Sequence, residues 1–196
     1  MNKKLLAAVL SIVLLSWPKT AAAADCSTFG GRATVVQANA LGIGSVVLSD
    51  TGNLDSTGGA TTASLLSASV AGLVAVNVMH ATAVGEGSSS QSEASVANLN
   101  LTVAGNTIGA DFLVPRANAY CERGGATVSG STEIDGLVVN GQSIVVTGSP
   151  NQTLSLPDGV LIILNEQTSS VQDQNGSITV NALHVTVPGV SHRCCG

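Results

Sequence analysis

The side chains that could do chemistry in this 196-residue chain form no recognised catalytic motif. The sequence lacks G-x-S-x-G, G-x-G-x-x-G, a phosphate-binding loop and H-E-x-x-H. Two carboxylate pairs, Asp111 with Glu122 and Glu133 with Asp135, have the residue types that hydrolyse glycosidic bonds. Aromatic residues make up only 2% of the chain, too few to line a sugar cleft, so solvated strand faces explain these charges better. We therefore predict that the protein is not an enzyme.

Two of the three histidines fall within apolar segments. His80 has the same strand parity as Val76, Val78 and Val84, which predicts that it faces the core or lies at a sheet edge. His184 alternates with apolar neighbours, which predicts that it points to the polar face of its strand.

Two segments contain residue types that bind metals. Asp50, Asn53 and Asp55 offer oxygen ligands for calcium, but their spacing fits no established calcium loop. Such residues in turns commonly bond their own backbone, which is the interpretation favoured here. The tail segment His192-Arg193-Cys194-Cys195 could bind zinc, but adjacent cysteines lack the usual C-x2-C geometry. We predict no metal site and no cofactor.

The four cysteines are candidates for disulfide bonds, because the chain carries an export signal described below. Cys26, Cys121, Cys194 and Cys195 permit three complete pairings, and their spacing cannot choose among them. A bridge between the adjacent tail cysteines would be strained. The favoured pairing is therefore Cys121 with one tail cysteine, and the alternative is Cys121 with Cys26.

The N-terminus has the three parts of a secretory signal peptide. Lys3 and Lys4 precede the apolar run of residues 5–15, and Ala22-Ala23-Ala24 offers a cleavage site before Asp25. The run is too short to span a bilayer comfortably, so we expect no membrane span in the mature chain. The predicted organisation is a signal peptide at 1–24, one domain at 25–190 and an irregular cysteine-containing tail at 191–196.

Removal of the signal peptide would change the charge of the chain, because all its lysines lie there. The mature protein would hold four arginines against twelve Asp and Glu, a formal net charge of −8. Such a chain repels nucleic-acid phosphates and anionic lipid, so neither is an expected partner.

The remaining sequence predicts strands almost throughout. Short apolar runs rich in Val, Ile, Leu, Thr and Ala alternate with clusters of Gly, Asn, Ser and Asp. Residues 60–78 could imitate a helix, but Gly72 and the following valines favour strand. Residues 85–93 and 50–62 are predicted to be polar loops. The expected fold is a single antiparallel β-sandwich-like domain, with an irregular β-solenoid as the alternative.

Turn signals and a recurring pattern refine this prediction. Asn140-Gly141 predicts a tight hairpin, Val103 to Ile108 a looser counterpart, and Pro157-Asp158-Gly159 the turn of a third. A branched residue, a spacer, a small residue or Asn and then Leu recur at unequal intervals. We predict that each copy is kinked or bulged at its third position, which is Gly72, Asn98, Gly136 or Ala182.

Several segments resemble the exported bacterial family called choice-of-anchor P. They are residues 129–134 (SGSTEI), 137–142 (LVVNGQ), 150–153 (PNQT), 163–167 (ILNEQ) and 178–185 (ITVNALHV). The resemblance covers most of residues 31–189 and implies a secreted or surface-displayed protein with a variable C-terminal anchor. It carries no catalytic residues. The chain departs from the family at residues 191–196, where members continue into another apolar strand that reaches a cysteine.

These observations predict a non-enzymatic secreted or cell-envelope domain with a structural or adhesive role. Its expected partners are cell-surface or matrix molecules or other copies of the chain, which an edge strand could recruit. The alternative is an extracellular module that binds a glycan or another small ligand, and a secreted hydrolase is a third hypothesis.

Overall fold

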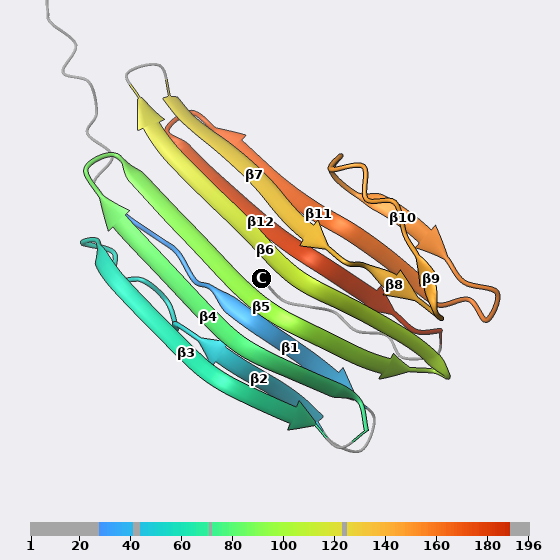
Figure 1. Ribbon diagram of the computed structural model, residues 1–196. Coiled ribbons are helices and arrows are strands. Elements are labelled where there is room, and N and C mark those ends of the chain that lie inside the picture. Colours follow the sequence, from blue (N-terminus) through green and yellow to red (C-terminus); the bar gives the residue numbers. More distant parts are fainter. Residues whose placement is uncertain (1–27, 41–43, 71, 123–124, 189–196) are drawn as a thin grey trace, which may run out of the picture.

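The computed structural model describes residues 28–40, 44–70, 72–122 and 125–188, which form twelve β-strands and no helix (Figure 1). Neighbouring strands in every sheet pair antiparallel, in agreement with the predicted sandwich-like fold. No helix among these residues is long and apolar enough to cross a membrane. The predicted signal peptide and tail lie outside the described residues.

The first layer is a long sheet in the order β3-β4-β5-β6. Beyond β6, β7 pairs with one half of that strand, and the short strands β8 and β9 continue the sheet beside the other half. The bounds are β3 Gly59–Val70, β4 Val74–Glu86, β5 Ser89–Val103, β6 Asn106–Glu122, β7 Gly125–Asp135, β8 Val138–Val139 and β9 Gln142–Ser143.

The second layer consists of two separate sheets. One contains β1 (Thr34–Ala40) and β2 (Gly44–Asp50), and the other contains β10 (Gln152–Ser155), β11 (Leu161–Gln172) and β12 (Asn175–Thr186). The β1–β2 sheet packs on β3, β4 and β5, whereas β11 and β12 pack on β6 and β7. The two sheets therefore cover different parts of the same face of the first layer.

The predicted hairpins are present. Asn140 and Gly141 have φ angles of 50° and 78°, and Ala104 and Gly105 have 47° and 79°. Both turns thus use the paired positive φ that two-residue hairpins require. The Pro157-Asp158-Gly159 turn joins β10 to β11.

The loop predicted at residues 85–93 is wrong. β4 and β5 extend through this segment and join by a tight turn at Gly87-Ser88. Its serines suggested a loop by composition, but Ser89, Ser90 and Ser92 lie on β5, where they pair with β4 and β6. The loop predicted at residues 50–62 is shorter than expected, because β3 begins at Gly59.

Positive φ angles occur at most positions where the recurring pattern predicted irregularity. Asn98, at φ 51°, has no partner in the β5–β6 pairing, although the register is the same on both sides of it, and Gly136 separates β7 from β8 at φ 63°. Gly72 lies instead in the turn between β3 and β4. At Ala182 the interruption has its positive φ on the opposite strand, at Asn165. The pattern therefore marks breaks in strand pairing, of which only some are bulges.

A further irregularity at Val78 corrects the prediction for His80. Val78 has φ 46°, and the β4–β5 register shifts around it. Val76 is buried before the shift, and Met79 and Ala81 are buried after it. His80 is consequently exposed on a strand that lies between β3 and β5, so it neither faces the core nor lies at an edge.

Aliphatic side chains from both layers form the main core. The fully buried members with the largest side chains include Met79 and Ile108 in the first layer and Ile162 and Leu164 in the second. None of the buried core residues in the described part of the chain is aromatic. The layers are therefore joined by contacts between Ile, Leu, Val and Met side chains.

Replacing Ile162 by alanine should lower the free energy of unfolding by about 2–5 kcal/mol, because the cavity would lie between the two layers. Leu66→Ala is the control, since Leu66 is 82% exposed, and its effect should stay within about 0.5 kcal/mol. Urea denaturation would measure both values. A similar loss in both variants would contradict this description of the core.

Candidate functional site

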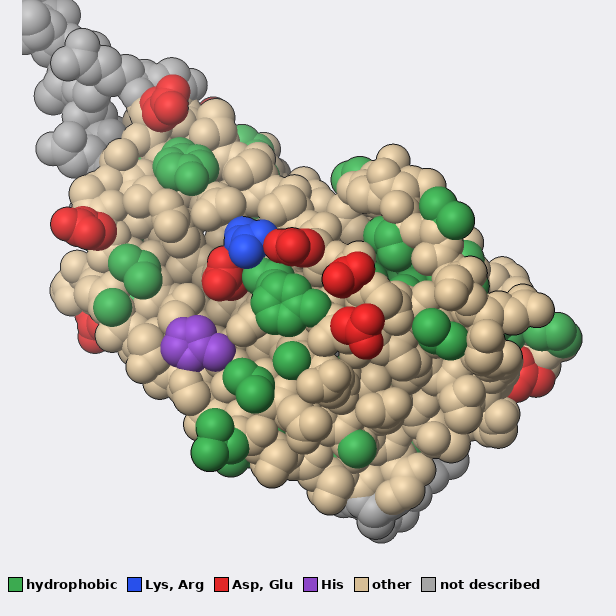
Figure 2. Space-filling model, in the orientation of Figure 1, with side chains coloured by type: hydrophobic (Ala, Val, Ile, Leu, Met, Phe, Trp, Pro, Cys, Tyr) green, Lys and Arg blue, Asp and Glu red, His purple; other side chains and the backbone are tan. Residues whose placement is uncertain are grey.

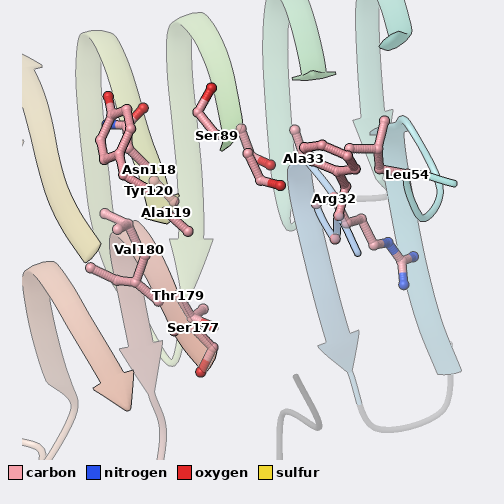
Figure 3. Close-up of a pocket in the computed structure, with 18 of the residues that line it drawn as sticks. Arg32, Ala33, Leu54, Ser89, Asn118, Ala119, Tyr120, Ser177, Thr179 and Val180 are labelled. Atoms are coloured by element: carbon pink, nitrogen blue, oxygen red, sulfur yellow. The ribbon is translucent and has the colours of Figure 1, made fainter. Parts of the chain in front are cut away.

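A cleft of about 1060 Å³ lies between the two sheets of the second layer (Figure 3). One wall is formed by residues 28–34, which lead into β1, and the other by residues 175–181 of β12. Residues of β5 and β6 form the floor. The cleft is thus bounded by three parts of the chain that are far apart in sequence.

The cleft occupies a place where the second layer has no described strand. β12 packs over β6 and β7, and β1 packs over β4 and β5. Among the described residues β12 pairs only with β11, and β1 pairs only with β2. The second edge of each strand therefore faces the cleft, with backbone groups that no described strand pairs.

Many of the side chains on the cleft floor are small, which leaves space above β5 and β6. Ser90, Ser92 and Ala94 of β5 and Ala117 and Ala119 of β6 line it. Towards the other end of the same two strands, the inward positions hold the larger Val96, Leu99, Ile108 and Leu113 of the main core. The first layer therefore fills the interior at one end and leaves space at the other.

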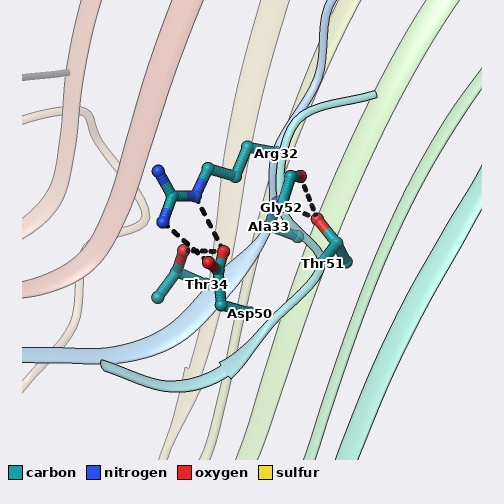
Figure 4. A network of polar contacts seen from close by, with 6 residues as sticks. All are labelled: Arg32, Ala33, Thr34, Asp50, Thr51 and Gly52. Carbon is teal, nitrogen blue, oxygen red and sulfur yellow. Dashed lines mark hydrogen bonds and ion pairs between the residues drawn. The ribbon is translucent and has the colours of Figure 1, made fainter. Parts of the chain in front are cut away.

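A polar network fixes the wall beside β1 (Figure 4). Arg32 donates two hydrogen bonds to Asp50, of 2.8 and 2.7 Å, and Thr34 Oγ1 donates a third of 2.8 Å. The backbone N–H of Ala33 donates to Thr51 Oγ1. The bonds from Arg32 lower the pKa of Asp50 to about 2, although partial burial opposes this shift.

The wall beside β12 is held by close approach of the layers. A Cβ atom built on Gly130 of β7 would lie 2.6 Å from Val180 Cγ2, and one on Gly176 would lie 2.9 Å from Val128 Cγ1. Only glycine leaves room at these positions for β7 and β12 to meet. Gln167 adds a hydrogen bond of 3.1 Å from Nε2 to the Gly130 carbonyl.

The carboxylates proposed from sequence as acid–base pairs do not line the cleft. Asp111, Glu122, Glu133 and Asp135 are exposed on β6 and β7. Glu133 lies 3.7 Å from Arg116, as one of two ion-pair partners of that side chain. These acids therefore belong to solvated surfaces.

His80 and His184 also lie apart from the cleft. His80 Nδ1 is 2.7 Å from Ser64 Oγ, and His184 Nδ1 is 3.0 Å from Glu166 Oε1. Burial opposes the lowering of the Glu166 pKa, but hydrogen bonds from Asn181 and His184 outweigh it. The described residues contain no group of three His, Cys, Asp or Glu that could hold a metal ion.

The three described aromatic residues do not all lie in the cleft. Phe112 and Tyr120 are about one-third exposed on β6, eight residues apart, which corresponds to about 26 Å along a strand. Tyr120 (Figure 3) and Phe29 both line the cleft, whereas Phe112 does not, and the Phe29 side chain packs against Gly58 and Gly85. On the face shown in Figure 2, hydrophobic side chains are scattered among uncharged polar surface.

Of the four predicted disulfide candidates, Cys121 lies at one end of the cleft, where it has a bonding partner. Cys26, Cys194 and Cys195 lie outside the described residues, so the predicted pairing stays a prediction.

The sequence did not reveal the cleft itself. Its floor includes Ser90 and Ser92, which fall in the segment predicted as a loop. The available signal was the change from large to small residues at alternate positions along β5. That signal is usable only when the segment is known to be a strand.

The Arg32–Asp50 contact predicts a pH dependence of stability. Because the folded-state pKa of Asp50 lies below the ordinary value of 3.8, this contribution is present above about pH 4 and is lost as the pH falls towards 2. We expect a loss of about 1 kcal/mol, since Arg32 is half exposed to solvent. Urea denaturation at several pH values should show this loss in the wild type and not in Asp50→Asn. Asp173→Asn removes a carboxyl from an exposed turn and should leave the loss unchanged.

No protein-family model, curated protein or solved structure matches this chain.

Proposed function

We propose that the protein is a non-enzymatic secreted or cell-surface domain with a structural or adhesive role, which associates with partners by accepting an extended strand in the cleft. The observation that carries this proposal is the position between the edges of β1 and β12 where no described strand lies, above a floor that includes many small side chains.

Backbone chemistry favours a strand as the occupant. Each free strand edge presents N–H and C=O groups that form hydrogen bonds with an added strand. The cleft presents two such edges, so one inserted strand could extend both sheets of the second layer. Its inward side chains would lie over Ala117, Ala119 and their neighbours, where small and medium apolar side chains fit.

The setting of this function is argued from the sequence. The signal-peptide pattern and the resemblance to the choice-of-anchor P family support export and a surface role. A mature chain without lysine cannot form the lysine–asparagine isopeptide bonds that stabilise many surface adhesins. Association through backbone pairing needs no such bond.

Ala119→Phe tests the proposal by filling the cleft without removing a core side chain. We expect the wild type to self-associate, or to be retained on cells or matrix, and the variant to lose at least tenfold in that affinity. Light scattering across a concentration series and pull-down assays would measure the two activities.

Two controls separate the cleft from other surfaces. Ser129→Phe adds the same bulk at an exposed position of β7, outside the cleft, and should bind like the wild type. Leu66→Ser alters β3, the edge strand of the first layer, and should also leave binding intact. A wild type that is monomeric and binds neither cells nor matrix would refute the proposal. So would a variant Ala119→Phe that binds normally.

A further inference from the structure

We infer that Cys121 forms its disulfide bond with Cys26, and that this bond ties the segment leading into β1 to the end of β6. The inference does not depend on the proposed function, because it rests on which cysteines can reach Cys121.

Cys121 lies level with the start of β12. It is the penultimate residue of β6 and pairs with Ala126 of β7. Across the layers, a Cβ atom on Gly176 would lie 3.0 Å from the Cβ of Ala126. A partner for Cys121 must therefore come close to the Gly176 end of β12.

The tail cysteines follow Pro188, which lies near the opposite end of β12. Pro188 contacts Gly159, which precedes β11 near the position where Leu161 pairs with Thr186. Twelve residues separate Gly176 from Pro188, which corresponds to about 40 Å of extended strand.

The tail is too short to return over this distance. Cys195 follows Pro188 by seven residues, a reach of at most about 25 Å. A disulfide adds no more than about 7 Å between Cα atoms. Cys194 and Cys195 therefore fall short of Cys121, and the pairing favoured from sequence fails on reach.

Cys26 precedes a described residue that lies at the same end of the fold as Cys121. Phe29 follows it by three residues and packs on Gly85, where a Cβ atom would lie 2.9 Å from the Cβ of Phe29. Gly85 pairs with Ser90, and Ser90 pairs with Ala119. Phe29 is therefore separated from β6 by about the width of two strands, or about 10 Å. The residue of β6 that lies across from it is Ala119, two residues before Cys121. Three residues and a disulfide span that distance.

Formation of the bond is an oxidation of two thiols. Each thiol loses a proton and one electron, and the S–S bond forms. The acceptor is the disulfide of a thiol oxidoreductase in the export compartment, which becomes a dithiol. Cys194 and Cys195 are then left to pair with each other or with cysteines of other chains.

Trypsin digestion without reduction distinguishes the alternatives, because the predicted mature chain has arginine as its only tryptic site. Cleavage after Arg32, Arg116, Arg123 and Arg193 puts the cysteines into peptides 25–32, 117–123 and 194–196. For protein exported by its host and alkylated before digestion, mass spectrometry should find 25–32 linked to 117–123. A link between 117–123 and 194–196, or an alkylated 117–123 peptide, would overturn the inference.

A thiol assay on folded variants gives a second readout. Cys26→Ser should leave one additional reactive thiol, and reduced and alkylated peptide maps should locate it at Cys121. The double variant Cys194→Ser, Cys195→Ser should keep the link between 25–32 and 117–123. Loss of that link in the double variant would also overturn the inference.

Discussion

The contact on which this structure depends is the meeting of aliphatic side chains between the two layers at one end of the sandwich. Ile162 and Leu164 from β11 enter the same cluster as Met79 and Ile108 from the first layer. Because no aromatic side chain is buried among the described core residues, many branched residues must supply the apolar area that joins the layers. Everything else in the second layer is positioned relative to this cluster.

The opposite end is held together by different means. There the inward positions of β5 and β6 hold mostly alanine and serine, the Arg32–Asp50 network fixes the segment beside β1, and the close approach at Gly130 and Gly176 joins β12 to β7. Such contacts fix two walls without filling the space between them. The cleft is thus a consequence of how apolar volume is distributed along β5 and β6, and the edges of β1 and β12 on its two sides are paired by no other described strand.

Local signals in the sequence predicted the local structure well. Asn140-Gly141 identified its hairpin because two positive φ angles are a requirement of that turn. His80 was misplaced because parity carries no information across a bulge such as the one at Val78. The cleft could not be predicted, because it depends on which strands pack over β5 and β6. Those contacts join residues far apart in the chain and are set by tertiary packing.

The interruptions at Val78, Asn98 and Asn165 have a consequence for how this chain can change in length. The β5–β6 and β11–β12 registers are the same on both sides of Asn98 and Asn165, and the β4–β5 register shifts beside Val78 and then returns, so each interruption is matched by the partner strand. Deleting one residue at such a position would shift the register and turn the following side chains to the opposite face of the sheet, with apolar groups towards water. Insertions and deletions should therefore be far better tolerated in the turns than at these three positions, and such residues should keep their spacing as the surface sequence drifts.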